Sequence, residues 1–294
     1  MNYYNEIKDK LIDNEIYSRV KDYSKERHRV VTYYEIGRLL NEAGSKYGDN
    51  IIEKYSKKLT SELGKKYSTS SLKRFRQFYN LIQKGATLSH QLSWSHYIEL
   101  IPLNDICIIN YYVELIEKGN LSIRQIREKI KSKEYERLPK TTRNKLIKKE
   151  KATITDYIKN PILIKTNDKH KTISEKTLKR IILDNIETFM HELGNSFSFM
   201  GSEYKIKVGN RYNYIDLLLF NPEYNCYVVV ELKVTELKKE HIGQIQVYMN
   251  YIDKNLREPY HNKTVGIIIC KKNNKYVIEY CSDKRIISRE YELV

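Results

Sequence analysis

Cysteine is scarce in this sequence of 294 residues, and its four occurrences are scattered. Cys107, Cys226, Cys270 and Cys281 form no C-x-x-C pair, so the ligand spacing of a structural zinc site is missing. Scattered thiols are typical of proteins in a reducing compartment. We therefore expect a cytoplasmic protein without a zinc centre.

Long apolar runs are also missing. No uninterrupted apolar segment approaches the roughly 20 residues of a membrane-spanning helix. The first ten residues, "MNYYNEIKDK", lack the apolar segment of a secretory signal. The sequence shows no internal repeat and no glycine-rich phosphate loop. These absences argue against a membrane partner, a repeat architecture and the phosphate-binding loop of many nucleotide enzymes.

Positive charge, in contrast, is plentiful and concentrated in the middle of the chain. Residues 1–50 hold 9 basic and 9 acidic residues, and residues 181–294 hold 15 of each. Residues 51–180 hold 29 basic against 13 acidic residues, and this difference of 16 equals the net charge of the whole chain, +16. Such a concentration attracts polyanions, of which DNA and RNA are the usual ones. The alternative is a solvated, lysine-rich surface that keeps the protein in solution.

Residues 1–133 are predicted to be helical. Apolar residues recur every three or four positions in two consecutive stretches: Ile52, Tyr55, Leu59 and Leu63, then Leu72, Phe75, Phe78, Leu81 and Ile82. Gly64 is a plausible end for the first helix, and the hydroxyl-rich "STSS" before Leu72 can cap the second. This outline resembles a helix-turn-helix, so we expect a DNA-binding domain.

The second of these helices carries the candidate nucleic-acid contacts. Lys73, Arg74, Arg76 and Gln77 lie beside its apolar stripe, from which they could reach phosphates or base edges. Half-buried helices often have such a polar face for solvation alone, so the alternative is structural. Trp94, the only tryptophan, is predicted to be a core residue at the start of a further helix.

From residue 134 the pattern changes twice. Residues 134–172 are basic and weakly periodic, and we expect a connecting segment there. Residues 173–294 form the second domain, in the order helix, three strands, helix, two strands. The predicted helices span 174–194 and 238–256, and the predicted strands span 197–208, 212–220, 226–234, 264–270 and 275–281. The fold class is thus α+β, with an all-helical domain followed by a mixed sheet with helices.

Three charged residues interrupt the apolar strands of this second domain. The run "VVVELKV" contains Glu231 and Lys233, which share one face because strand side chains alternate. Asp216 interrupts "YIDLLLF" in the preceding strand, and two adjacent antiparallel strands would bring it beside Glu231. Two neighbouring carboxylates repel each other unless a cation lies between them. Carboxylates, the backbone carbonyl of Leu232 and water would suit Mg²⁺ or Mn²⁺.

A metal held in this way can promote phosphodiester hydrolysis. It activates a water molecule and neutralises charge that develops on the phosphate. Lys233 could orient that water or stabilise the transition state. The alternative is structural: Glu231 and Lys233 would form a buried ion pair at a sheet edge, and Asp216 would cap a turn.

These residues resemble the motif of the PD-(D/E)xK nuclease superfamily. Asp216, followed fifteen residues later by Glu231-x-Lys233 on the next strand, matches the motif. Ile215 replaces the motif's proline, a common departure in the superfamily. The resemblance implies a restriction-endonuclease-like C-terminal domain with these three residues at its active site.

The same resemblance implies further site residues on two helices. Many members of the superfamily carry a glutamate on the first helix, for which Glu187 is the candidate and Glu192 the rival. RecB-like members carry Gln-x-x-x-Tyr on the helix that follows Glu-x-Lys. Gln244 and Tyr248 match this pattern, and their spacing places them on one helix face.

Further stretches resemble the YhcG-like bacterial family, long catalogued as a domain of unknown function. The stretches are "IETFMHELGNSFSFMG", "YIDLLLF", "VVVELKV", "GQIQVYMNYID", "YSTSSLKRFRQFY" and "QLSWSHYIELI". The resemblance spans nearly the whole chain. It implies a nuclease with a helical DNA-binding N-terminal domain and a link to restriction or mobile-element defence.

Three functions remain open at this point. The leading hypothesis is a metal-dependent DNA endonuclease, acting as a homodimer if both strands are cut, with a restriction or defence-system partner. The second is a nucleic-acid-binding module that does not cleave or that needs a partner. The third is an RNA-processing nuclease, because RNA presents the same phosphates.

Overall fold

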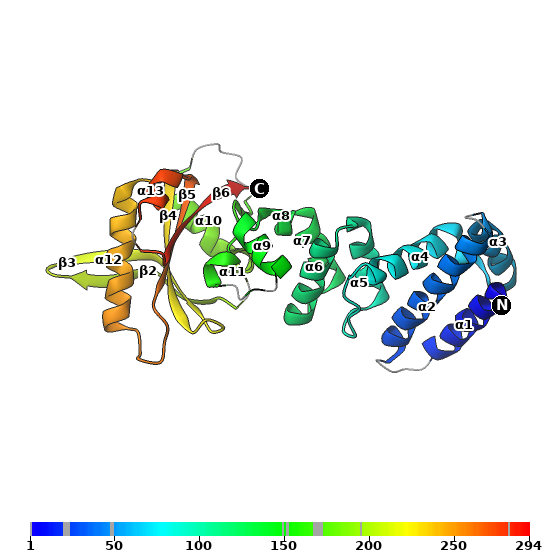
Figure 1. Cartoon of the computed structure of the whole chain (residues 1–294). Helices are drawn as coiled ribbons and strands as arrows, with labels where there is room; N and C mark the ends of the chain where they lie inside the picture. Colours follow the sequence, from blue (N-terminus) through cyan, green and yellow to red (C-terminus); the bar gives the residue numbers. More distant parts are fainter. Residues whose placement is uncertain are drawn as a thin grey trace. The chain divides into compact units, whose positions relative to one another are not determined.

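The chain forms two compact units, Met1–Tyr135 and Glu136–Val294. The structure is a computed structural model that describes residues 2–19, 24–47, 50–148, 150, 153–166, 173–194, 196–281 and 283–294. The first unit is helical, and the second contains a sheet with helices (Figure 1). In these ranges no helix is both long and apolar enough to cross a membrane.

The first unit confirms the predicted helical periodicity. Its elements are α1 (Tyr3–Ser18), α2 (Ser24–Tyr47), α3 (Ile51–Leu63), the 3₁₀ turn η1 (Lys65–Tyr67), α4 (Thr69–Gln83), α5 (Trp94–Leu100), the 3₁₀ turn η2 (Ile101–Leu103), α6 (Ile106–Gly119) and α7 (Ile123–Lys131), and the boundary to the second unit falls within α8 (Glu134–Arg137). Gly64 ends α3 with a positive φ of 100°, and the Ser68 hydroxyl caps α4 by accepting the Ser71 N–H. Trp94 begins α5 and contacts the rings of Tyr33 and Phe75, as expected of a core residue.

The second unit is built on a six-stranded mixed sheet, which confirms the α+β class. Its elements are α9 (Lys140–Lys148), the 3₁₀ turn η3 (Ile154–Asp156), β1 (Ile162–Ile164), α10 (Glu175–Asp184), α11 (Ile186–Leu193), β2 (Ser198–Val208), β3 (Arg211–Asn221), β4 (Cys226–Glu236), α12 (Lys239–Asn255), β5 (Val265–Lys272), α13 (Lys275–Glu279) and β6 (Ile286–Leu293). The strand order is β1-β6-β5-β4-β3-β2. The first four of these strands run parallel, and β3 and β2 continue the sheet antiparallel.

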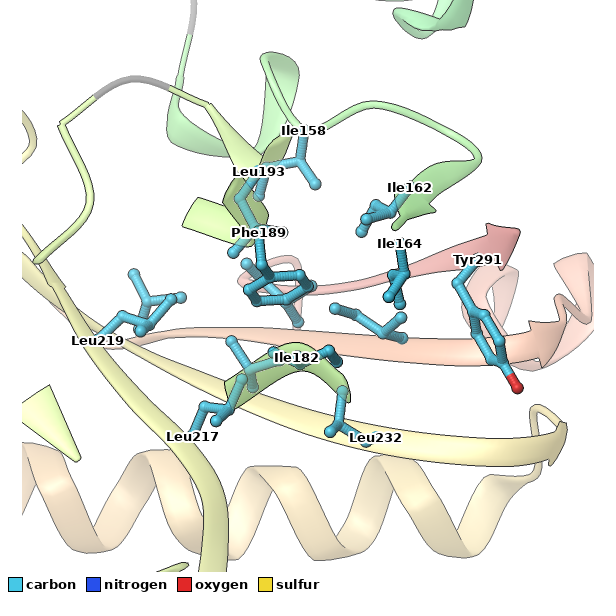
Figure 2. Packing of buried hydrophobic residues seen from close by; sticks show 14 of the residues in the cluster. Ile158, Ile162, Ile164, Ile182, Phe189, Leu193, Leu217, Leu219, Leu232 and Tyr291 are labelled. Atoms are coloured by element: carbon cyan, nitrogen blue, oxygen red, sulfur yellow. The ribbon is translucent and has the colours of Figure 1, made fainter. Parts of the chain in front are cut away.

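Helices cover both faces of this sheet, which explains the continuous apolar character of β4. On one face, Ile182 of α10 and Phe189 of α11 pack with Leu217 and Leu232 of the central strands (Figure 2). On the other face, α12 packs through Ile245, Met249 and Ile252 against Val229 and its neighbours. Residues of β4 therefore alternate between two apolar layers, and a charged residue in this strand needs a specific partner.

Two predicted elements differ from the structure. The single helix expected over 174–194 is broken at Asn185, whose φ of −132° and ψ of 38° leave the helical region between α10 and α11. The strand expected over 275–281 is instead the short helix α13, because the Asn274 side chain accepts the Val277 N–H and caps a helical turn. The last strand of the sheet is β6, further along the chain.

The expected connecting segment 134–172 is largely part of the second unit. Its strand β1 pairs in parallel with β6, with Ile162 opposite Tyr291. Arg289 of β6 donates to the carbonyl oxygens of Ile158 and Thr155 and so ties the segment to the sheet. Residues 167–172 lie outside the described residues.

Candidate active site

Strands β3 and β4 bring Asp216 beside Glu231 where the two strands part. Their last registered pair is Leu217 with Val230, so Asp216 and Glu231 come next. Beyond this pair the Leu232 N–H donates to the Asp216 carboxylate, with 2.9 Å between the nitrogen and Oδ2. The side chain of Asp216 thus satisfies an amide that has left the backbone ladder.

Glu231 is a buried carboxylate with one oxygen available. Its side chain is 2% exposed, and Oε1 accepts a 2.9 Å hydrogen bond from Lys233 Nζ. Oε2 is also buried and has no hydrogen-bond partner among the described residues. Burial and, to a smaller extent, the charge of Asp216 raise the pKa of Glu231 to about 7, although Lys233 opposes the rise. An unsatisfied buried oxygen costs free energy and calls for a ligand.

Lys233 lies between two carboxylates. Its Nζ atom is 2.9 Å from Glu231 Oε1 and 3.7 Å from Glu175 Oε2, which belongs to the first turn of α10. Burial alone would lower the pKa of Lys233, but the neighbouring carboxylates hold it above its ordinary value. Lys233 is therefore a charged ammonium in a site that is largely closed to solvent.

A second lysine from α10 contacts Asp216. Lys179 Nζ lies 2.8 Å from Asp216 Oδ1 and 3.0 Å from Glu203 Oε1 of β2. Burial lowers the pKa of Lys179, but its hydrogen bonds to Asp216 and Glu203 raise it above the ordinary value. Lys179 fixes one oxygen of Asp216 while the Leu232 N–H fixes the other.

Glu175 and Lys179 were missed by the sequence analysis, although a local signal was present. Both follow the helix cap Ser174, whose side chain accepts the Thr177 N–H. They are four residues apart and share one face of α10, while Leu178 belongs to the core. An acidic residue and a lysine at this spacing, immediately after a cap, could have been considered with the strand charges.

The structure does not bring the two predicted helix glutamates to the site. The side chain of Glu187 is 87% exposed and its nearest charged partner is His191, at 3.9 Å. Glu192 accepts hydrogen bonds from Arg137 and from the Leu163 N–H, and Lys159 Nζ lies 3.8 Å away. Both residues belong to α11, which packs beside β1.

The Gln-x-x-x-Tyr pair lies on α12, and its two side chains contact each other. Gln244 Nε2 donates to the Tyr248 hydroxyl over 3.0 Å. Tyr248 is 5% exposed and packs in the layer between α12 and the sheet. Burial raises the pKa of Tyr248, the Gln244 hydrogen bond lowers it, and the charge of Glu231 raises it. The structure therefore places Tyr248 in the apolar layer under α12, with Gln244 hydrogen-bonded to it.

The nucleic-acid candidates of α4 divide into two groups. Lys73 and Arg74 are exposed, whereas Arg76 is half-buried. The Gln77 side chain donates to Asn104 Oδ1 over 2.8 Å and to the Ile101 carbonyl over 3.4 Å. Gln77 thus joins α4 to the turn after η2 and has a structural role. Lys73 and Arg74 stay predicted phosphate contacts.

Two family models match this chain. Residues 155–294 match the YhcG PDDEXK nuclease domain, and residues 13–137 match the DUF1016 N-terminal domain. The second unit is therefore a nuclease domain of the PDDEXK class, in the position where the strand charges predicted one. Together with the N-terminal match, this shows that the chain belongs to the YhcG-like family.

Individual relatives are distant in sequence. The YhcG protein of Escherichia coli (strain K12) is 22% identical over 309 residues, which cover 89% of this chain and 82% of that protein. A repair endonuclease from Pyrococcus abyssi is 15% identical, covers 43% of this chain and 49% of its own, and has a TM-score of 0.29. The structure of an EndoMS–dsDNA2 complex is 18% identical, covers 44% of this chain and 48% of its own, and has a TM-score of 0.29. The matched region thus spans about half of each solved chain.

The unsatisfied carboxylate of Glu231 makes stability depend on pH. The raised pKa means that the folded protein keeps this proton between about pH 4.5 and 7 while the unfolded chain releases it. Stability is therefore lost as pH rises through this window. Glu231→Gln should be more stable than the wild type in EDTA, by about 3 kcal/mol at pH 8, and the difference should vanish near pH 4.5.

Urea unfolding followed by far-UV circular dichroism measures this difference. The chain offers an internal control, because its single tryptophan, Trp94, lies in the first unit. Tryptophan fluorescence should therefore give the same unfolding midpoint for Glu231→Gln and the wild type. Equal circular-dichroism transitions of Glu231→Gln and the wild type at pH 8 would show that the ionised Glu231 carboxylate does not destabilise the folded protein.

Proposed function

We propose that this protein is a metal-dependent DNA endonuclease that hydrolyses phosphodiester bonds. The observation that carries the proposal is the buried Oε2 of Glu231 next to Asp216, which has no hydrogen-bond partner in the part of the chain that the structure describes. A lysine on the same strand face completes the set that phosphodiester hydrolysis requires: two carboxylates and a cation.

The described residues contain no group of three or more His, Cys, Asp or Glu side chains with the spacing of a metal centre. The site proposed here has two carboxylates, Asp216 and Glu231, and completes its ligands with backbone and water. In a strand, the C=O and N–H of one residue point to the same side. Because the Leu232 N–H points to Asp216, its carbonyl faces the same edge and can serve as the third oxygen ligand. Such an all-oxygen set fits Mg²⁺ or Mn²⁺.

When bound, the metal would activate the attacking water and neutralise charge on the scissile phosphate. Lys233 would hold that water and stabilise negative charge on the phosphate oxygens, since its ammonium lies in a site of low dielectric constant. Lys179 would keep Asp216 in its ligating orientation through the 2.8 Å contact. Glu175 would keep Lys233 charged. The water oxygen would attack phosphorus and give up its proton to solvent, and the bond from phosphorus to the leaving sugar oxygen would break as that oxygen takes a proton from a solvent water.

The distribution of positive charge supports a nucleic acid as the substrate. The positive charge of residues 51–180, with Lys73 and Arg74 exposed on α4, would bind the phosphate backbone. A role in bacterial genome defence, a homodimer and a defence-system partner are further parts of this proposal. They follow from the family resemblance and from the need for two active sites to cut two strands.

Removal of the metal tests the proposed function. Purified full-length protein would be incubated with supercoiled plasmid, branched DNA and RNA, each with Mg²⁺, Mn²⁺ or EDTA. We expect cutting of DNA with either metal and none in EDTA. Faster cutting of RNA would favour the RNA-processing alternative. No cutting of any substrate, with salt-sensitive DNA binding intact, would favour the binding module that needs a partner.

A further inference from the structure

The β2–β3 hairpin carries a lysine–tyrosine surface that the active site does not use. Lys205 pairs with Tyr214 and Lys207 pairs with Tyr212 across the two strands. Opposed residues of an antiparallel pair share one face, so these four side chains lie on the same face of the hairpin. A two-residue turn joins the strands after Val208, with a φ of 60° at Gly209. Figure 1 shows the outer end of the hairpin extending past α12.

The two faces of this hairpin have different environments. On one face, Ile206 and Ile215 are buried in the layer that packs with α12. On the other face, Lys205 and Lys207 are exposed, Tyr212 is 57% exposed and Tyr214 is 53% exposed. Tyrosine is common in strands, and lysine on an edge strand prevents pairing with other chains. Neither preference explains why two neighbouring tyrosine rings are exposed to solvent.

The charge of the hairpin favours an anionic partner. Residues 204–215 contain three basic residues, Lys205, Lys207 and Arg211, and no acidic residue. Lys205 Nζ lies 3.9 Å from the centre of the Tyr212 ring, and Lys207 Nζ lies 6.0 Å from it. Cations and aromatic rings alternate on one surface, as in proteins that bind single-stranded nucleic acids.

This surface is continuous with the active site. Glu203 and Asp216 lie between the registered pairs Tyr204–Ile215 and Ser202–Leu217, and Lys179 contacts both carboxylates. Tyr214 lies two residues before Asp216, which corresponds to about 7 Å along a strand. Tyr212 lies four residues before Asp216, which corresponds to about 13 Å. A strand of nucleic acid held at Asp216 would thus reach the two rings within a few nucleotides.

We propose that the hairpin face formed by Lys205, Lys207, Tyr212 and Tyr214 binds a single-stranded segment of DNA next to the scissile phosphate. Unpaired bases would stack on the two tyrosine rings, and the lysines would contact the intervening phosphates. A duplex keeps its bases stacked on each other and offers no base face to the rings. The inference rests on the proposed function for the position of the cut, and it adds a preference for flaps, forks or other DNA with an unpaired strand.

Two double variants of the full-length protein test the inference. Tyr212→Ala/Tyr214→Ala removes both rings, and Tyr212→Phe/Tyr214→Phe retains them. Tyr276→Ala/Tyr280→Ala is the matched control, because these residues are 63% and 84% exposed and Lys275 lies 5.2 Å from the Tyr276 ring. Affinity for fluorescent oligodeoxythymidine is measured in EDTA. We expect a loss of roughly tenfold or more for the alanine variant at the hairpin, because it removes both rings on which bases would stack. The phenylalanine variant and the control should bind like the wild type.

Photocrosslinking separates the hairpin from the basic first unit, which can also bind DNA. An oligonucleotide containing 5-iododeoxyuridine is irradiated with the wild-type protein, and the modified peptide is identified by mass spectrometry. We expect an adduct on Tyr212 or Tyr214. Unchanged affinity of the hairpin alanine variant together with no adduct in residues 204–215 would overturn the inference.

The outcomes also distinguish this inference from the proposed function. Binding and crosslinking in EDTA need no hydrolysis, so they can succeed in a protein that does not cut DNA. Metal-dependent cutting with normal binding by the hairpin variants would retain the nuclease and overturn the hairpin surface. Weakened binding by those variants without any cutting would retain the surface and overturn the nuclease.

Discussion

Replacement of Glu231 by glutamine is expected to reduce metal-dependent cleavage by roughly 10³-fold or more, because it removes several kcal/mol of metal-mediated stabilisation. Glutamine has nearly the shape of glutamate but no charge, and it puts a weaker ligand or an N–H donor at the buried Oε2 position. Calorimetric titration with Mn²⁺ should show a corresponding loss of metal binding. Asp216→Asn should behave in the same way, because Asp216 is the other carboxylate of the site.

Glu187→Gln is the matched control for this experiment. It makes the same chemical change at a glutamate whose side chain is 87% exposed. We expect its cleavage rate and metal affinity to equal those of the wild type. DNA affinity in EDTA should be retained in Glu231→Gln, since removal of a negative charge cannot weaken attraction to phosphates. Normal cleavage by Glu231→Gln would show that the catalytic carboxylates lie elsewhere.

The strand part of this site was predictable because its signal is local. Charged residues within apolar strands stand out against the alternation of the pleat, and a short connection between β3 and β4 limits the register. Asp216 and Glu231 are consecutive to the pair Leu217 and Val230, as a simple antiparallel hairpin requires. The sequence therefore sufficed to bring the two carboxylates together.

The helix part of the site was not predictable in the same way. Which helix residue reaches Lys233 depends on where α10 ends and how it packs on β4. The break at Asn185 turns α11 toward β1, and the Glu187 side chain points into solvent. Glu175 reaches Lys233 instead. The choice of Glu175 over Glu187 depends on tertiary packing, and it cannot be predicted from the periodicity of apolar residues alone.

The errors at the C-terminal end have a related cause. β6 carries charged residues and shows no long apolar run, yet it pairs in parallel with both β5 and β1. Its partner β1 is more than a hundred residues away in sequence, so no turn fixes the pairing. The segment 275–281, with its apolar Val277 and Ile278, looks more like a strand, but its Asn274 cap favours a helical turn.

Replacement of Lys233 by methionine should have the other large effect, and it separates catalysis from metal binding. We expect the cleavage rate to fall by roughly 10²–10³-fold, the range seen when one stabilising group is removed from a transition state. Metal affinity should be retained or increased, because loss of a neighbouring positive charge favours a divalent cation. A large loss of metal binding would show instead that Lys233 only holds Glu231 in place.

The stability of the same variant distinguishes the ion pair from the catalytic role. Lys233→Met leaves the buried Glu231 carboxylate without its 2.9 Å partner, which should destabilise the protein in EDTA by about 3 kcal/mol. The double variant Glu231→Gln/Lys233→Met should recover that stability, because the buried charge is gone, but it should remain inactive. Recovered stability without recovered cleavage would mean that the Glu231–Lys233 pair serves catalysis and lowers the free energy of unfolding. The double variant could instead stay as unstable as Lys233→Met. That result would mean that the aliphatic part of Lys233 stabilises the strand by packing, and that the buried Glu231 carboxylate does not need the positive charge of Lys233.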